Sequence, residues 1–515
     1  ILGGQMFQNL ESLLIWIVSI EHIHLAIYIM FLIAILVSER SPETIVAWIF
    51  TITVFPVFGF ILYLVFGINW RKNRIESLQN KNRRSLFKGF PSLTKNFLKY
   101  DPAEIFHSRK VKPEDLDILM NNAGISQEES EIVKLLYASE GTYLTHNSSY
   151  EMFYDGKEAF DSIIQDLENA KETIYMEYFI WKSDKLGEKI KDILVKKAKE
   201  GVKIRLLFDG MGSLGTISEK YRKELLKVGV EFKYFLDIKF ALSKFNYRNH
   251  RKITIVDNRI LHTGGMNLGE EYITGGRRFE SWRDTNVRIQ GELVLHYLAI
   301  FVTDWLNSGG KQDFKMDDIE EVIEEHKNLR NESPYVMQVS SSGPDTIWTT
   351  LKYTYSKLIT SAKEEILIQS PYFIPDTSLV SQLKIAALSG VKIKLMIAGV
   401  PDKKIPYWIA ETYFEELLMA GVEIYRYKAG FIHCKNIVVD GKVSTMGTCN
   451  FDMRSFEINY EINSIFYNEE ISQSIRNQFY KDLDFCEEIK EENLKETVFW
   501  RKIRNSLFRV VSPLM

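Results

Sequence analysis

The sequence predicts an α/β protein with two duplicated lobes, each a mixed β-sheet flanked by helices, preceded by an N-terminal transmembrane helical hairpin. Three observations predict this fold class. Segments of the chain recur at an offset near 190 residues, helical stretches alternate with short β-branched runs, and residues 45–66 contain no charge. Alternating helices and strands are typical of α/β folds, and a repeat of this length predicts two lobes of similar topology.

The composition is that of a globular protein with more than one domain. The chain has 515 residues, of which 45% are hydrophobic and 26% charged, and its formal net charge is -3. Domains usually contain about 100–200 residues, so two or three are expected. The small net charge argues against a nucleic-acid binder. The three cysteines are too few for a disulfide framework and favour a reducing compartment, and no Cys/His cluster has metal-ligand spacing.

Residues 1–70 are predicted to anchor the chain in a membrane. Ile45–Phe66 is a run of 22 uncharged residues, enough to cross a hydrocarbon core of about 30 Å at about 1.5 Å per residue. Pro56 predicts a kink in this span. Leu25–Ser38 supplies a shorter first span, because a longer one would include Glu21 at a cost of about 2.5–3.5 kcal/mol. A cleaved signal peptide is the alternative for this first segment, and the second span that follows at once disfavours it.

Residues 71–140 are predicted to form a basic linker next to the membrane. Within residues 71–90 a single acid, Glu76, stands among basic residues: Arg71, Lys72, Arg74, Lys81, Arg83, Arg84 and Lys88. The positive-inside rule places this side of the membrane, and the soluble part that follows, in the cytoplasm. Such a run would attract anionic lipid at about 1 kcal/mol per basic residue. A flank that stops translocation without lipid specificity explains it equally well.

The duplication covers residues 141–330 and 331–490. AKETIYMEYFI, from Ala170, returns as AKEEILIQSPYFI, from Ala362, and GVKIRLLFDG returns as GVKIKLMIAG. Within each lobe the short β-branched runs predict strands and the longer polar stretches between them predict helices. The two lobes are therefore expected to share one topology.

Residues 491–515 are predicted to end in an amphipathic helix. Apolar residues recur there at helical spacing with basic residues among them: Phe499, Ile503, Leu507 and Val510, with Arg501, Lys502, Arg504 and Arg509. This pattern suits a helix that lies on a membrane surface. Packing of the helix on the protein itself explains the pattern equally well.

Each lobe carries the same cluster of polar residues. The first copy is HRKITIVDNRILHTGGMN and the second is HCKNIVVDGKVSTMGTCN. The residues of the two copies are His250, Lys252, Asp257 and Asn267, and His433, Lys435, Asp440, Thr448 and Asn450. The His, Lys, Asp and Asn recur at one offset, 183. One such string could arise by chance, but two at matching places in a repeat predict a shared function.

The spacing within each motif has a chemical meaning. Residues i and i+2 of a strand point to the same face, so His250 and Lys252 are expected to project together, as are His433 and Lys435. The lysines, with the asparagines, could neutralise a phosphodiester by donating to its oxygens. One histidine could then attack phosphorus while the other protonates the leaving oxygen. For a single histidine or lysine a place in the core or on a solvated strand edge would be the better interpretation, and the pairing reverses that preference.

The acidic residues have less certain roles. Asp257-Asn258 and Asp440-Gly441 resemble hairpin turns, so these acids are expected to fix a loop more than to touch substrate. Asp284 and Glu461 stand downstream at similar strand positions in the two lobes. A carboxylate bound to an imidazole nitrogen would set its tautomer, as in a catalytic triad. A surface ion pair is the alternative for both.

The paired His-x-Lys-x4-Asp motifs resemble the phospholipase D superfamily, and further details resemble its bacterial cardiolipin synthases. These details are the paired spans, PETIVAWIFTITVFPVFGFILYLVFG, HCKNIVVDGKVSTMGTCNFDMRSFEINYE, PDKKIPYWIAETYFEELLMAGVEIY and the terminal SPLM. The likeness covers nearly the whole chain. It implies phospholipase D-like lobes packed about a pseudo-twofold axis, with both motifs at one site and neither metal nor other cofactor. Thr448 is a departure, since many relatives have serine there, but a hydroxyl is retained, and it is expected to bind the substrate phosphate together with Asn267 and Asn450.

The resemblance also implies an activity and a location. His250 resembles the family's nucleophile and His433 its acid and base, while Glu461 matches the position that pairs with histidine and Asp284 is its counterpart. One phosphatidylglycerol would give its phosphatidyl group to another through a phosphohistidine intermediate, with cardiolipin and glycerol as products. The enzyme would be a multi-pass protein of the bacterial inner or plasma membrane, with its catalytic part on the cytoplasmic side. Whether it forms a homo-oligomer is left open.

Several rival functions remain at this stage. The nearest is a phospholipase D that delivers the phosphatidyl group to water and forms phosphatidic acid, because the motifs are common to both activities. A phosphatidylserine synthase would need a CDP-lipid donor, and a nuclease is hard to reconcile with a membrane anchor. A catalytically silent membrane scaffold is disfavoured by the intact motifs. Phe240, Phe245, Tyr407, Trp408 and Phe414 could line an acyl path, although such residues are more often core.

Overall fold

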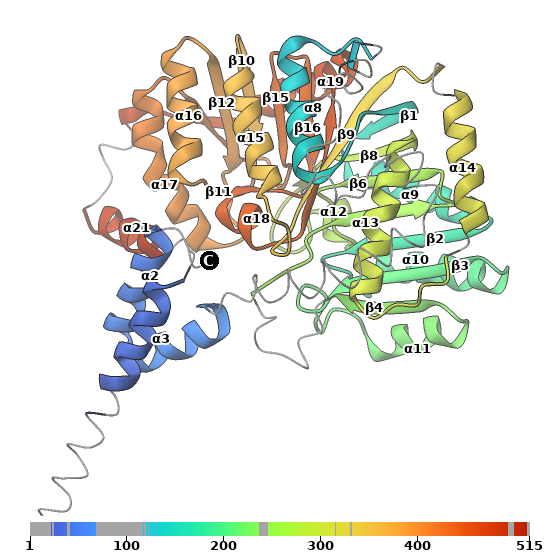
Figure 1. Cartoon of the computed structure of the whole chain (residues 1–515), viewed down its shortest axis with the longest axis horizontal. Helices are drawn as coiled ribbons and strands as arrows, with labels where there is room; N and C mark the ends of the chain where they lie inside the picture. Colours follow the sequence, from blue (N-terminus) through green and yellow to red (C-terminus); the bar gives the residue numbers. More distant parts are fainter. Residues whose placement is uncertain are drawn as a thin grey trace, which may run out of the picture. The chain divides into compact units, whose positions relative to one another are not determined.

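The structure is a computed structural model that describes residues 25–38, 42–67, 123–235, 246–314, 316–329, 332–492 and 499–511, with a few isolated positions. It contains two compact units, residues 1–69 with 507–515 and residues 70–506 (Figure 1). The predicted basic run of residues 71–90, Phe240 and Phe245, and the terminal SPLM lie outside the described residues.

The first unit contains consecutive short helices. Residues 25–36 are helical, and α2 (Pro42–Val54), α3 (Pro56–Leu62) and the π-helix η1 (Tyr63–Gly67) follow. Their core is formed by Ile35, Trp48, Ile52 and Tyr63, with the rings of Trp48 and Tyr63 packed edge to face at 5.1 Å. The Tyr28 and Thr53 hydroxyl groups, 2.7 Å apart, join the helix of residues 25–36 to α2.

The helix expected over residues 45–66 is interrupted. A break near Pro56 is present as predicted, because α2 ends at Val54 and Pro56 begins α3. Proline has no N–H to continue the hydrogen-bond ladder, and its ring clashes with the preceding turn, so the helix restarts there. Among the described residues, no helix combines the length and apolar character required to cross a membrane. The predicted transmembrane hairpin is not confirmed by this structure.

The second unit is built on one large mixed sheet of 15 strands, in the order β19-β13-β12-β10-β15-β16-β18-β9-β1-β8-β6-β5-β2-β3-β4. The strands are β1 (Thr145–Phe153), β2 (Thr173–Tyr178), β3 (Lys203–Asp209), β4 (Glu231–Phe235), β5 (Lys252–Val256), β6 (Ile260–Gly264), β8 (Asn286–Gly291), β9 (Tyr335–Ser342), β10 (Glu365–Gln369), β12 (Lys392–Ala398), β13 (Glu423–Tyr427), β15 (Asn436–Val439), β16 (Val443–Gly447), β18 (Glu461–Phe466) and β19 (Cys486–Ile489). Two small parallel pairs join β7 (Trp282–Arg283) to β14 (Phe431–Ile432) and β11 (Phe373–Ile374) to β17 (Phe451–Asp452).

The strand order is the same on both sides of the β1–β9 pair. From β1 the order is β8, β6, β5, β2, β3 and β4, and from β9 it is β18, β16, β15, β10, β12 and β13. The corresponding pairs are parallel or antiparallel in the same places. The two halves therefore form one continuous sheet in a single compact unit.

Helices cover both faces of this sheet (Figure 1). The helices of the chain after residue 123 are α8 (Gln127–Glu140), α9 (Gly156–Asn169), α10 (Lys185–Lys199), α11 (Glu219–Lys227), α12 (Glu271–Thr274), α13 (Leu293–Asn307), α14 (Met316–Leu329), α15 (Thr350–Ser361), α16 (Thr377–Leu388), α17 (Lys404–Met419), α18 (Met453–Glu457), α19 (Glu469–Leu483) and α21 (Phe499–Val511), of which α21 packs on α17 and not on the sheet. Capping carboxylates mark several starts; Asp184, for example, accepts the N–H of Gly187 at 3.0 Å in α10.

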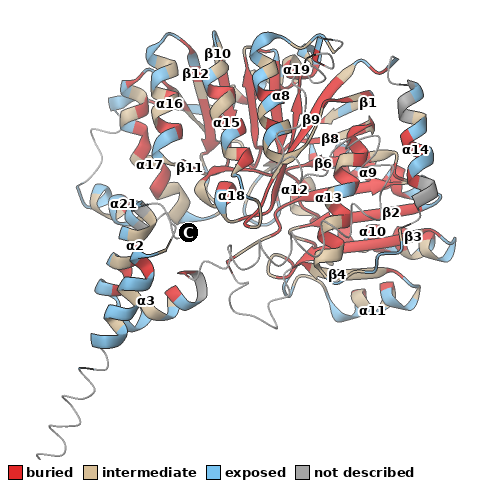
Figure 2. Ribbon diagram, viewed as in Figure 1, coloured by how far each residue is buried: buried red, intermediate tan, exposed pale blue. Residues whose placement is uncertain are grey.

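The sheet is buried on both faces (Figure 2). In β2, Tyr175 belongs to the core under α13, which includes residues of both halves, whereas Ile174 and Met176 belong to a second core with α9, α10 and α11. Successive side chains of a strand point to opposite faces, which explains the division. Such strands consist of continuous apolar runs, as the sequence has them.

The predicted terminal helix is present as α21. Within it, Arg504 lies over the Trp408 ring at 4.0 Å, and Asn505 donates to Glu411 at 2.9 Å. Phe499 and Trp500 are exposed. One side of α21 therefore packs on α17, in agreement with the interpretation that the helix packs on the protein. Apolar side chains of α21 remain exposed.

Candidate active site

His250 lies directly before β5 and is held by the second half of the sheet. Its main-chain N–H donates to the carbonyl oxygen of Tyr460 at 2.9 Å. Its Nδ1 lies 2.9 Å from Oε2 of Glu461 and 3.1 Å from the carbonyl oxygen of Thr448. Both neighbours accept hydrogen bonds, so Nδ1 carries the hydrogen and Nε2 the lone pair. The second half therefore fixes the tautomer of His250.

His433 is held in the same way by the first half. It follows β14, which pairs with β7, and its N–H donates to the Arg283 carbonyl oxygen at 2.7 Å. Its Nδ1 lies 2.7 Å from Oδ2 of Asp284. Gly265 leaves the space for this carboxylate, since a Cβ there would lie 2.1 Å from Oδ1 of Asp284. The expected hydrogen bond between each imidazole and a carboxylate is present, and each acid comes from the opposite half.

The two histidines share one electrostatic environment. Burial lowers the pKa of both His250 and His433 to about 4. In each case the paired carboxylate raises this pKa, while the ammonium groups of Lys252 and Lys435 lower it. Both imidazoles are therefore neutral near pH 7, and each responds to the charges of both motifs. The contacts of His250 with Thr448 and Glu461, and of His433 with Asp284, place site residues of the two halves next to each other.

The motif lysines are buried beside the histidines. Burial lowers the pKa of Lys252 to about 7 and also lowers that of Lys435. The Lys252 ammonium donates to the His250 carbonyl oxygen at 2.5 Å, and that of Lys435 donates to the His433 carbonyl oxygen. The strand interpretation of the motif was inaccurate here, because the histidines precede β5 and β15 and pair through their backbone with the opposite half.

The two motif asparagines have different surroundings. Oδ1 of Asn267 accepts the N–H of Ile180 at 3.1 Å, and Nδ2 donates to the Tyr272 hydroxyl at 2.9 Å. Asn450 is also buried, and its Oδ1 has no hydrogen-bond partner among the described residues. Asn267 is therefore engaged within the fold, while Asn450 keeps an unused polar atom.

The Thr448 hydroxyl does not fit the phosphate contact expected of it. It donates to the Ile462 carbonyl oxygen at 3.2 Å and accepts the Ile462 N–H at 2.9 Å. Its main-chain carbonyl is the part that contacts His250. Thr448 therefore acts through its backbone, and its hydroxyl joins the turn to β18.

Asp257 and Asp440 do not fit a place among catalytic residues. Asp257 accepts the N–H groups of three consecutive residues, 171–173, and Asp440 those of residues 363–365, at 2.7–2.9 Å. Both have positive φ, 51° and 53°. They follow the ends of β5 and β15, opposite to the ends where the histidines lie. The expected turn-fixing role is therefore the one that the structure supports.

Aromatic residues around the histidines were not identified from the sequence. The rings of Tyr272, Trp282 and Phe431 have centroids 5.8–6.0 Å from that of His433, and Phe179 lies 5.1 Å from His250. Trp282 stands two residues before Asp284, so its proximity could have been inferred. The other aromatic residues did not carry a motif.

The residues suggested for an acyl path lie elsewhere where they are described. Phe414 is fully buried and, with Tyr407, lies beside the Arg426 guanidinium. Trp408 lies under Arg504 of α21. These three side chains of α17 therefore pack in the core or at the protein surface, as expected for aromatic residues considered one at a time.

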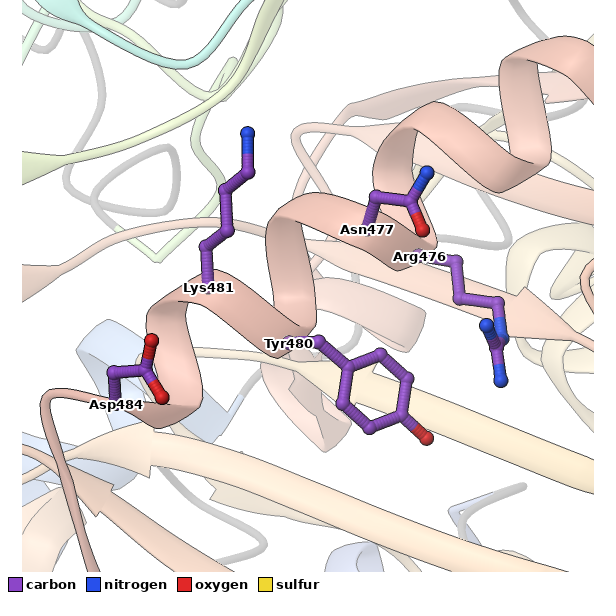
Figure 3. Close-up of a pocket in the computed structure, with 5 residues that line it drawn as sticks. All are labelled: Arg476, Asn477, Tyr480, Lys481 and Asp484. Carbon is purple, nitrogen blue, oxygen red and sulfur yellow. The ribbon is translucent and has the colours of Figure 1, made fainter.

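The described residues contain no metal cluster, and polar groups in one surface depression are already used. No group of three or more His, Cys, Asp and Glu side chains among them could hold a metal ion. An open depression of about 570 Å³ lies along α19 and is lined by Arg476, Asn477, Tyr480, Lys481 and Asp484 (Figure 3). Arg476 and Tyr480 both bind Glu365, so two of its polar groups are already used.

Two histidines from the two halves of one sheet, each bound to a buried carboxylate, form a site whose groups are suited to phosphodiester transfer. Comparisons with known proteins make the class specific. The family described as "Cardiolipin synthase, PLD-like domain" matches residues 163–305 and 355–483. A family described as "Phospholipase_D-nuclease N-terminal" matches residues 26–67, the helices of the first unit.

Curated relatives match over nearly their whole length. A cardiolipin synthase of Clostridium perfringens (strain SM101 / Type A) is 36% identical over 484 residues, covering 93% of this chain and 96% of the relative. The major cardiolipin synthase of Bacillus subtilis (strain 168) is 34% identical over 511 residues, covering 98% of this chain and 100% of the relative. Among solved structures, phosphatidylserine synthase of Haemophilus influenzae Rd KW20 matches with a TM-score of 0.56 at 15% identity, covering 76% of this chain and 100% of that one. This last likeness shows the fold alone.

The chain belongs to the cardiolipin synthase family of the phospholipase D superfamily. It is accordingly a phosphatidyltransferase.

Proposed function

We propose that the chain is a cardiolipin synthase that transfers a phosphatidyl group from one phosphatidylglycerol to another. The names of its curated relatives support this activity. The observation that carries the mechanism is the pair of crossed hydrogen bonds, His250 with Glu461 and His433 with Asp284. Each leaves an imidazole neutral, with its hydrogen on Nδ1 and a lone pair on Nε2.

In the first step the Nε2 of His250 attacks the phosphorus of phosphatidylglycerol. The N–P bond forms, the bond from phosphorus to the glycerol oxygen breaks, and His433, which takes up a proton from solvent when the anionic substrate binds, gives this proton to the departing glycerol. In the second step the primary hydroxyl of another phosphatidylglycerol loses its proton to His433 and attacks phosphorus. Cardiolipin forms, the N–P bond breaks, and both histidines return to their starting state.

The lysines supply the charge that this chemistry needs. Lys252 and Lys435 would neutralise the non-bridging oxygens in a buried site, where such interactions are strong. An anionic phosphodiester placed between them also offsets their effect on His433 and raises its pKa, because an opposite charge favours the protonated form. Substrate binding thereby helps to load the acid, whose pKa is otherwise about 4. We propose Asn450 as a further contact, because the N–H groups of its side-chain amide could donate to a phosphate oxygen.

We further propose a membrane location. Apolar side chains of the first unit are exposed, including Val37, Val57 and Phe58, and an apolar surface of this kind suits lipid better than water. Residues 25–67 would form a membrane hairpin, with residues 71–140 as the basic linker and residues 141–330 and 331–490 as duplicated lobes in the cytoplasm. The common strand order of the two halves supports a duplication.

Product analysis tests the proposed reaction. Purified full-length protein is mixed with phosphatidylglycerol vesicles, and cardiolipin, glycerol and phosphatidic acid are measured. Cardiolipin and glycerol in equal amounts support the synthase. Phosphatidic acid as the main product would assign a hydrolase instead.

A set of histidine variants links this reaction to the site. His250→Ala and His433→Ala are expected to abolish product. His146→Asn, a half-buried histidine of β1 outside both motifs, is the matched control and should keep activity. Wild-type turnover in His250→Ala would refute the assignment.

A further inference from the structure

Behind each histidine lies a buried arginine–aspartate pair. Arg251 binds Asp304 near the end of α13, and Arg283 binds Asp482 near the end of α19, with Nε 3.0 Å from Oδ1. All four side chains are buried. An unpaired buried charge costs several kcal/mol, so each pair depends on both partners.

Both arginines also hold the main chain of an acid that orients a histidine. Nε of Arg251 donates to the carbonyl oxygen of Glu461 at 3.4 Å. Nη1 of Arg283 donates to the carbonyl oxygen of Asp284 at 2.5 Å. The arginines come from different places, since Arg251 follows His250 whereas Arg283 precedes Asp284. The two halves thus reach one arrangement by different residues.

A third residue lies beside each pair, and it is a glutamate in the first half and a glutamine in the second. Glu177 of β2 lies opposite Ile253 of β5, and Gln369 of β10 lies opposite Asn436 of β15, so they hold the same place in the sheet. Nε2 of Gln369 donates to Oδ2 of Asp482 at 2.8 Å. A neutral donor therefore faces the aspartate in the second half.

Glu177 has the corresponding position in the first half, where a protonated carboxyl group could donate a hydrogen bond to Asp304. Its Oε1 accepts from the Asn249 amide, and its Oε2 has no donor among the described residues. Two charged groups act on its carboxyl group: Asp304 opposes its ionisation and Arg251 favours it. Two ionised carboxylates beside one buried arginine would repel each other, which favours a protonated Glu177. Burial and Asp304 raise the pKa of Glu177 well above its usual value, in agreement with this geometry.

We propose that Arg251–Asp304 and Arg283–Asp482 are positioning pairs, which fix the main chain of the acids that orient His250 and His433, and that Glu177 stands beside the first pair as a neutral acid. The positioning role rests on the proposed function, whereas the protonation of Glu177 does not. Glu177 is also a second possible counter-ion for Arg251: if Asp304 loses its charge, Glu177 can ionise and pair with Arg251. Gln369 cannot ionise, so the second half has no such substitute for Asp482 as the counter-ion of Arg283.

A double-mutant cycle on the first pair tests the proposal. Glu177→Gln reproduces the second half and should keep kcat within about twofold of the wild type. Asp304→Asn should lower kcat about tenfold, because Glu177 takes over, and the double variant should lower it about 100-fold or more, as a displaced catalytic group does. KM should change little in all three, since none of these side chains contacts the lipid. Activity is scored as total phosphatidyl transfer, to lipid or to water, so that failure of the synthase assignment does not affect this test.

Infrared spectroscopy of the full-length protein tests the proton directly and does not need turnover. The difference between wild type and Glu177→Gln near pH 7 should contain the band of a protonated carboxylic acid. A carboxylate band alone would overturn the proposal. So would a Glu177→Gln variant as impaired as Asp304→Asn, or a double variant no worse than Asp304→Asn.

Discussion

Replacing Glu461 by glutamine should slow phosphatidyl transfer without weakening lipid binding. The Glu461 carboxylate is fully buried, and accepts from His250 at 2.9 Å and from the Asn459 amide at 3.1 Å. Burial opposes its charge, but His250 and Lys252 lower its pKa overall, so it is ionised at neutral pH. Glutamine keeps the shape and removes the charge that stabilises the imidazolium.

The size of the effect follows from the hydrogen bond. A hydrogen bond to a charged group contributes about 1.5–3 kcal/mol, and each 1.4 kcal/mol or so changes a rate tenfold, so kcat should fall about 10-fold to 150-fold. If the new amide donates to Nδ1, the hydrogen of His250 moves to Nε2 and the loss grows toward about 10⁴-fold, as in a triad with the wrong tautomer. KM should stay close to the wild-type value.

The assay is initial-rate cardiolipin formation from phosphatidylglycerol vesicles, with kcat and KM resolved. Glu292→Gln is the matched control, because Glu292 is also buried but binds a main-chain N–H, that of His146. A Glu461→Gln enzyme with more than half of wild-type kcat, or one whose defect lies in KM alone, would refute the reasoning.

Three further predictions concern charge, loop and space. The value of kcat/KM should fall as pH rises through about 7, because Lys252 loses its proton there. Lys252→Arg should move this fall to higher pH, and an identical pH profile in the two enzymes would contradict the role of Lys252. Asp257→Ala and Asp440→Ala should each lower the free energy of unfolding by about 2 kcal/mol, since three N–H groups lose their acceptor. At temperatures below the lowered Tm the value of kcat should be unchanged, and a loss of kcat at unchanged Tm would show that these acids take part in catalysis. Gly265→Ala should displace the Asp284 carboxylate from His433 and lower kcat about tenfold or more, and normal kcat there would contradict the need for that contact.

Much of the sheet could be predicted because its strands are continuous apolar runs that occur twice. The Ala170 and Ala362 repeats lead into β2 and β10, and the Gly201 and Gly390 repeats into β3 and β12, at the same places in the sheet. The sequence did not reveal that β1 and β9 pair and join the halves. That contact lies between strands far apart in the chain, and no local pattern encodes it.

The site was predictable in its residue types and less so in its contacts. The histidines and the acids Asp284 and Glu461 are adjacent in the structure, and their repetition identified them. The crossing of the partners could not be inferred, because it depends on the β7–β14 pair and on the contact of His250 with Tyr460. The contacts of the Thr448 hydroxyl with the main chain of Ile462 could not be inferred, because a hydroxyl near a motif can bind backbone or substrate equally well.

The most direct test of the account is to trap the covalent intermediate. Full-length enzyme is mixed with phosphatidylglycerol, quenched within a turnover, digested and analysed by mass spectrometry under conditions that preserve phosphohistidine. The account predicts a phosphatidyl group on the imidazole of His250, absent from His250→Ala. A phosphatidyl group on His433 instead, or full turnover with neither histidine modified, would contradict it.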